Sequence, residues 1–196
     1  MYPQQMPEDV ASSAERLLYQ EFQRQLPDTF IVMYSVKWLM RDRTHHDRDG
    51  EIDFLIVHRA LGLLVLEVKG GRIRIDSRTR QWYTMDRDNH ETLLKKSPFD
   101  QARDNLYALK SKLEEVPKTR PYIYRLQRGV AFPNVVVDQS DIGLYGDREI
   151  VIDSTDLGRL EATVKRIMGS PEHGPALSEA AERALVDTLE PSLEIR

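Results

Sequence analysis

Two carboxylates and one amine stand at spacings that suit metal-dependent hydrolysis. Asp53 ends the string Gly-Glu-Ile-Asp, and Glu67 and Lys69 lie in the string Glu-Val-Lys-Gly-Gly at residues 67–71. Two acidic side chains that face each other can share a divalent cation, and an adjacent amine adds positive charge. The spacing therefore points to a metal-dependent hydrolase.

Two short apolar segments, residues 52–58 and 63–69, are expected to pair as the β-hairpin that positions these groups. Both segments are rich in branched residues, and the turn between them contains Gly62, which can take a positive φ. A turn that closes on Gly62 places Asp53 across from Glu67. Directly opposite side chains lie roughly 5 Å apart at Cβ, which lets two carboxylates bind one cation.

The second segment of the hairpin has two different faces. Lys69 lies two residues beyond Glu67 and therefore points to the same face. The opposite face consists of Leu64, Leu66 and Val68. We expect the apolar face to pack under a helix and the charged face to carry the chemistry. A solvent-facing Glu-x-Lys pair is the alternative, but an uncompensated charge inside an apolar run costs several kcal/mol.

The order of the other predicted helices and strands indicates a single domain. Helices are expected at residues 7–25, 98–116, 155–168 and 178–189. Further strands are expected at residues 30–39, 72–76, 81–85, 129–132, 135–138 and 150–153. Ser97 provides an N-cap and Pro98 the first turn of the second helix, whose apolar residues then repeat at helical spacing.

The two strings of the hairpin, together with Pro-Phe-Asp-Gln-Ala at residues 98–102, resemble the nuclease-related domain (NERD) family. This family is a branch of the PD-(D/E)XK nuclease superfamily, and the resemblance covers about residues 15–133. It implies an α/β fold with a restriction-endonuclease-like core, a mixed β-sheet flanked by helices, here followed by extra C-terminal helices. We expect the core to occupy residues 1–153 and the helical extension residues 154–196, with a helicase region as its expected continuation.

The resemblance also implies roles for individual residues of the hairpin. Asp53 and Glu67 would bind Mg²⁺ or Mn²⁺, with the carbonyl of Val68 as a third ligand, and hard oxygen ligands suit these ions. Lys69 would orient the attacking water and stabilise negative charge, while the metal lowers the pKa of that water.

Two further catalytic candidates come from helices. Gln101 is expected to line the active groove, with an ordinary polar flank of the helix as the alternative; the superfamily often has a tyrosine four residues later, where this chain has Asn105. In the first helix Glu15 falls on the apolar face near Phe22 and matches an acidic site residue of the resembling nucleases. We expect its carboxylate to reach toward Asp53 and Lys69, with a structural salt bridge as the alternative.

Composition and charge indicate which kinds of partner the protein can have. The net charge is −4, but basic residues flank the predicted site in sequence, and we expect four of them to contact the DNA backbone. These four are Arg72, Arg74, Lys95 and Lys96. A solvated surface is the alternative. The chain has no cysteine, no apolar run that approaches the ~18 residues of a membrane span and no secretory leader pattern, so we expect a cytoplasmic protein that does not contact membranes.

The leading hypothesis is a Mg²⁺- or Mn²⁺-dependent deoxyribonuclease that acts through a metal-activated water. One alternative is a catalytically inactive DNA-binding module associated with a helicase, in the same chain or a separate one. Another is a protein-interaction domain that uses its C-terminal helices. Metal binding at Asp53 and Glu67 distinguishes the first hypothesis from the other two.

Overall fold

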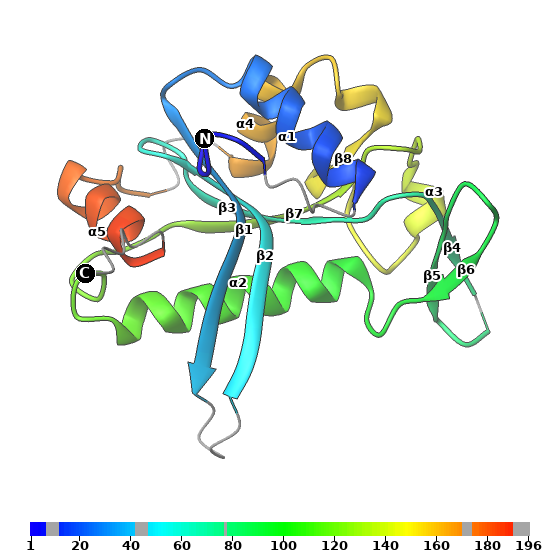
Figure 1. Cartoon of the computed structure of the whole chain (residues 1–196), viewed down its shortest axis with the longest axis horizontal. Coiled ribbons are helices and arrows are strands. Elements are labelled where there is room, and N and C mark those ends of the chain that lie inside the picture. The colour runs from blue at the N-terminus through cyan, green and yellow to red at the C-terminus, as the bar shows by residue number, and fades with distance from the viewer. Residues whose placement is uncertain (7–11, 42–46, 77, 170–173, 190–196) are drawn as a thin grey trace.

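A mixed five-stranded sheet forms the centre of the computed structural model, which describes residues 1–6, 12–41, 47–76, 78–169 and 174–189 (Figure 1). The strand order is β1-β2-β3-β7-β8. The first three strands are antiparallel, and the last two run parallel to β3. The bounds are Phe30–Arg41 for β1, Asp47–His58 for β2, Gly62–Val68 for β3, Leu126–Phe132 for β7 and Val151–Asp153 for β8.

Helices cover both faces of this sheet (Figure 1). Helices α1, Ser13–Gln25, and α4, Leu160–Met168, share one core cluster with the sheet. Helices α2, Pro98–Glu115, and α5, Glu179–Leu189, pack against the other face. The expected α/β fold, with a mixed sheet flanked by helices in a restriction-endonuclease-like core, is confirmed. No helix among the described residues is long and apolar enough to cross a membrane.

The hairpin of β2 and β3 has the predicted register. His58 pairs with Gly62 and Phe54 pairs with Leu66, so Asp53 is one step beyond the last backbone pair. Gly62 has a φ of 93°, and a Cβ at this position would lie 2.4 Å from the carbonyl oxygen of Arg125. Only glycine therefore suits the position that sets the register.

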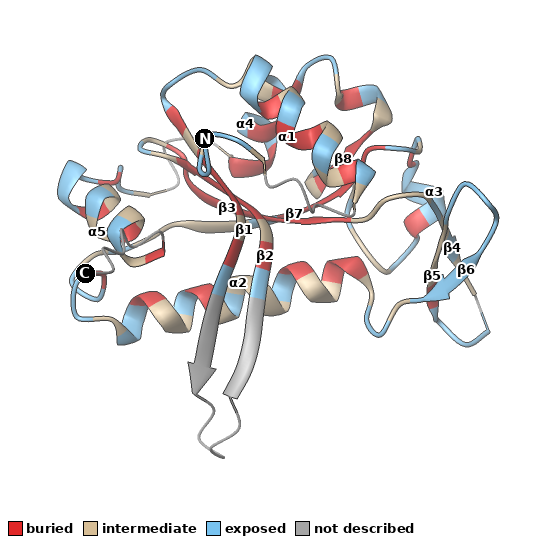
Figure 2. Cartoon of the chain, in the orientation of Figure 1, coloured by how far each residue is buried: buried red, intermediate tan, exposed pale blue. Residues whose placement is uncertain are grey.

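Both faces of β3 are buried, and this corrects one prediction. Its apolar face packs with α1 and α4 as expected. However, Leu63 and Val65, on the face of Glu67, are also fully buried, in the cluster that includes residues of α2 and α5. Figure 2 shows β3 in the colour of buried residues. The 18-residue helix α2 crosses this face and removes most of it from water. The expectation of one core face and one chemical face is therefore wrong for most of the strand, and the polar groups are confined to its C-terminal end.

A second, three-stranded sheet lies between β3 and α2 in the sequence. It consists of β4, Arg72–Ile75, β5, Trp82–Met85, and β6, Glu91–Leu93, and the third strand was not predicted. Trp82 is buried and packs edge-on against Phe99 of α2, which holds this small sheet against the main body.

Residues 135–138, predicted to be a strand, are irregular. The amide of Val137 donates to the side chain of Asp153 at 2.9 Å, so a carboxylate takes the hydrogen bond that a sheet neighbour would otherwise accept. Short helices that were not predicted occur nearby: α3, Gln139–Ile142; η1, Arg148–Ile150; and η2, Ser154–Asp156.

One of the predicted helix starts agrees with the structure and two do not. Ser97 caps α2 as predicted, since its Oγ accepts the amide of Asp100 at 3.0 Å. The helix expected from residue 155 begins at Leu160, because η2 precedes it. Helix α1 begins at Ser13 and not at residue 7, because Ser12 is its N-cap and the Ser12 Oγ accepts the amide of Glu15 at 3.3 Å. Residues 7–11 of the expected helix lie outside the described residues. The expected division of the chain after residue 153 stays a prediction.

Candidate active site

The three residues of the hairpin motif lie together at the C-terminal end of β3. The Lys69 ammonium is 2.6 Å from Glu67 Oε1, and Asp53 Oδ2 accepts the backbone amide of Val68 at 2.7 Å. A cavity of about 330 Å³ opens over them. It is lined by Glu51, Asp53, Glu67, Lys69, Lys96, Gln101, Asp104 and Asn105.

Strand β1 is distorted next to Asp53. Ser35 lies between the backbone pairs formed by Tyr34 and Val36, directly across from Asp53, and its φ is 54°. A left-handed conformation costs a non-glycine residue about 1–2 kcal/mol, and such strain tends to gather at functional sites. The Ser35 hydroxyl donates to Glu51 Oε1 at 2.7 Å, so the distorted residue holds a further carboxylate at the same cavity.

Burial raises the pKa of both central carboxylates. It raises the pKa of Asp53 to about 8, and the negative charge of Glu67 adds to this rise, whereas the amide of Val68 and the charge of Lys69 oppose it. Burial also raises the pKa of Glu67, which is only 4% exposed, against the effect of Lys69. Neither carboxylate ionises readily beside the other, so the pair forms a site that a divalent cation would stabilise.

Oxygen ligands dominate this cavity. Among the described residues, its lining includes four carboxylates and no histidine, which fits a hard cation such as Mg²⁺ or Mn²⁺ and not a soft one. The residues present therefore fit the metal that the sequence predicted.

Glu15 is half-buried on α1 and is held by a tyrosine. The hydroxyl of Tyr34 donates to Glu15 Oε2 at 2.7 Å, and burial together with this bond raises the pKa of Tyr34. The charge of Glu15 also raises the pKa of both Asp53 and Glu67. The described contacts thus tie Glu15 to Tyr34, and its influence on the two carboxylates is electrostatic.

Helix α2 brings two amide side chains to the cavity. Gln101, singled out from the sequence, donates from Nε2 to the carbonyl oxygen of Lys96 at 2.9 Å. Asn105 donates from Nδ2 to Glu67 Oε2 at 3.3 Å. Sequence reasoning did not give Asn105 a role. Its position four residues after Gln101 places it on the same face of the helix, and this spacing could have indicated that it reaches the cavity.

The four basic residues expected to contact DNA lie in different surroundings. Lys96 lines the cavity and pairs with Asp104 at 2.7 Å, and Lys95 is exposed. Arg74 is held on the small sheet: its guanidinium makes two hydrogen bonds to Glu91, at 2.5 and 2.7 Å, and lies 4.1 Å from the centre of the Tyr83 ring.

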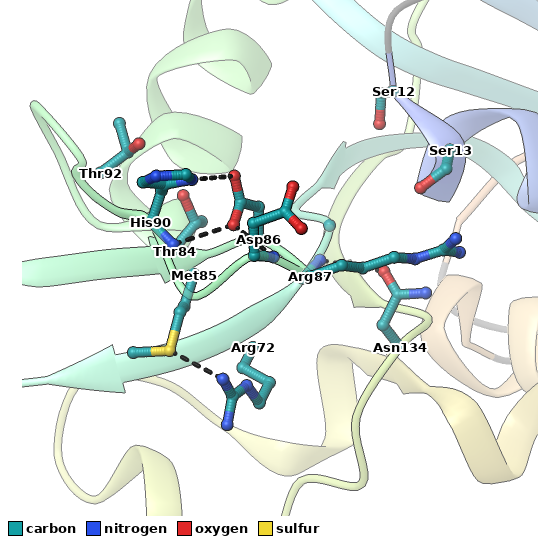
Figure 3. Close-up of a pocket in the computed structure, with 13 residues that line it drawn as sticks. Ser12, Ser13, Arg72, Thr84, Met85, Asp86, Arg87, His90, Thr92 and Asn134 are labelled. Atoms are coloured by element: carbon teal, nitrogen blue, oxygen red, sulfur yellow. Dashed lines mark hydrogen bonds and ion pairs between the residues drawn. The ribbon is translucent and has the colours of Figure 1, made fainter.

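Arg72 belongs to a larger cavity of about 700 Å³ beside the small sheet (Figure 3). Its guanidinium donates to Asn89 and Met85. The same cavity contains Asp86, Asp88 and His90, whose ligand atoms lie within 4.8 Å of one another.

The hydrogen bonds of a turn explain why Asp86, Asp88 and His90 lie close together. Asp86 Oδ1 accepts the amides of Asp88 and His90, each at 2.9 Å, and these bonds shape the turn between β5 and β6. The bond from His90 lowers the pKa of Asp86. The carboxylates of Asp86 and Asp88 are exposed, whereas that of Glu67 in the smaller cavity is buried.

Comparison with known families gives one match. The model of the nuclease-related domain matches residues 11–133, which span α1 to β7 and include every expected catalytic residue. Searches of curated proteins and of solved structures gave no match.

Proposed function

Because the chain belongs to the nuclease-related domain family, we propose that it is a divalent-metal-dependent nuclease that hydrolyses phosphodiester bonds of DNA. The observation that carries this proposal is the convergence of a buried carboxylate, Glu67, a half-buried one, Asp53, and one ammonium in a single cavity. Buried charges of this kind are costly to a fold, so their retention at one place supports a function.

In this proposal Asp53 and Glu67 hold Mg²⁺ or Mn²⁺, with the carbonyl oxygen of Val68 as the third protein ligand. When bound there, the ion would lower the pKa of a water and supply positive charge near the phosphate. Lys69, whose ammonium already lies at the cavity, orients the water and stabilises the negative charge that develops on the phosphate oxygens.

Glu15 and Gln101 support this centre from two helices. The negative charge of Glu15 makes the site more attractive to a cation, consistent with its effect on the pKa of both central carboxylates. Gln101 holds the backbone at Lys96 and so positions that lysine at the cavity.

DNA contact would be made through phosphates, by Lys95 and Lys96 just before α2 and by Arg72 and Arg74 on the small sheet. Such contacts neutralise the backbone without reading the bases. Lys96 and Arg74 are paired with carboxylates in the free protein, so each would exchange its partner for a phosphate. A helicase partner and a cytoplasmic location stay predictions.

Incubation of the purified protein with linear, circular and single-stranded DNA tests the proposal. We expect the protein to cleave DNA in Mg²⁺ or Mn²⁺ and EDTA to abolish this cleavage. The Asp53→Asn variant should not cleave. Metal-independent DNA binding with no cleavage of any substrate would instead support the inactive binding module.

A further inference from the structure

The carboxylate of Glu67 is held at both of its oxygens by different donors. Lys69 Nζ lies 2.6 Å from Oε1, and Asn105 Nδ2 donates to Oε2 at 3.3 Å. Glu67 is only 4% exposed, so water cannot readily replace a donor that is lost. Because the last torsion of a glutamate side chain is broad, these two donors decide how the carboxylate is turned.

The two donors differ in one respect that matters for a cation. Lys69 carries a positive charge, which repels a divalent ion at the oxygen that it occupies. Asn105 is neutral, so it can keep its hydrogen bond to Glu67 when positive charge arrives. Asn105 comes from α2 and is half-buried, so its position is independent of the hairpin that carries Glu67.

We propose that Asn105 is a positioning residue that orients the Glu67 carboxylate for the divalent cation. This inference rests on the proposed function. It also gives the two amides of α2 separate tasks: Gln101 holds the backbone at Lys96, and Asn105 holds Glu67. Residues that orient metal-binding groups from behind typically change metal affinity about 10–100-fold when they are removed.

Calorimetric titration of the full chain with Mn²⁺ tests this role. Asn105→Ala removes the donor, and Asn105→Leu removes it while filling a similar volume, so that lost packing can be told from the lost hydrogen bond. Asn105→Gln restores an amide with one more methylene. The control is Lys110→Ala on the same helix, because Lys110 is exposed and pairs only loosely, at 3.9 Å, with Glu114. Thermal melting without metal verifies that each variant is folded.

We expect folded Asn105→Ala and Asn105→Leu to bind Mn²⁺ about 10–100-fold more weakly than the unmodified protein. Asn105→Gln should recover part of the loss, and Lys110→Ala should match the unmodified protein. Unchanged Mn²⁺ affinity in a folded Asn105 variant would overturn the inference and leave the proposed function intact. No Mn²⁺ binding by the unmodified protein would overturn both.

Discussion

Lys69 and Glu67 form an ion pair of 2.6 Å inside the cavity that also contains Asp53. The pair places a positive charge at the position where a cation would otherwise bind Glu67. Without metal, Lys69 therefore partly compensates the buried carboxylate. With metal bound, the ion would take over this compensation and leave the ammonium available to the phosphate.

Separate substitutions at this pair should have different effects. Glu67→Ala removes a metal ligand, and we expect it to weaken Mn²⁺ binding and abolish cleavage. Lys69→Ala should keep most of the metal binding but lower kcat by about 10²–10³-fold, the usual effect of losing one electrostatic stabiliser of a transition state. Mn²⁺ calorimetry and a DNA cleavage assay measure both effects. Undiminished cleavage by both variants would rule out these roles.

The raised pKa of Asp53 predicts how stability depends on pH. An unfolded aspartate loses its proton near pH 4, whereas burial holds the pKa of the folded Asp53 at about 8. The folded state binds more protons between these values, so the stability of the metal-free protein should fall as the pH rises through this window. Asp53→Asn removes the charge and should flatten the dependence.

At pH 8 we expect metal-free Asp53→Asn to melt several degrees above the unmodified protein, since about 1 kcal/mol moves the Tm of a domain of this size by about 2–4 °C. Added Mn²⁺ should stabilise the unmodified protein but not the variant. Thermal denaturation from pH 4 to pH 8 checks both effects, and a variant that melts lower across the whole range would assign Asp53 a structural role.

Glu15 should matter more for turnover than for stability. Glu15→Gln keeps an acceptor for the Tyr34 hydroxyl but removes the charge that acts on both central carboxylates. We expect lower kcat and weaker Mn²⁺ binding with little change in Tm. Tyr34→Phe serves as the comparison, because it removes the hydrogen bond and leaves the charge. A large loss of Tm with unchanged turnover in Glu15→Gln would mark the residue as structural.

Arg72 and Arg74 can be tested by the salt dependence of DNA binding. Neutralising both should weaken binding across sequences and reduce the slope of affinity against salt by up to about 2, because each phosphate contact releases nearly one counterion. Arg183→Ala on α5, where Arg183 pairs with Glu179 at 3.1 Å, is a matched control of an exposed arginine. An unchanged slope in the double variant would place Arg72 and Arg74 outside the DNA path.

Local sequence rules predicted the hairpin well. Gly62 fixes the turn, and the alternation of residues then fixes which side chains share a face. The same rules could not predict that α2 would cross the charged face and bury Leu63 and Val65 there. That packing depends on how a helix distant in sequence lies against the sheet.

Contacts between elements distant in sequence explain the other differences between the predicted and the observed structure. Asn105 acquires its contact with Glu67 only when α2 lies over β3. Strand β6 is only three residues long and all three residues are exposed, so it has no hydrophobic alternation to reveal it. Residues 135–138 read as a strand because Val135, Val136 and Val137 are β-branched, but the side chain of Asp153 captures the amide of Val137.

A crystal structure determined with Mn²⁺ at pH 8, with anomalous diffraction to locate the ion, tests the central claim most directly. We predict an anomalous peak between the carboxylates of Asp53 and Glu67, at ligand distances of about 2.0–2.3 Å, with the Lys69 ammonium displaced from Glu67 Oε1. A protein that cleaves DNA in Mn²⁺ but shows its only peak at Asp86, Asp88 and His90, or none at the Asp53 and Glu67 cavity, would contradict the account.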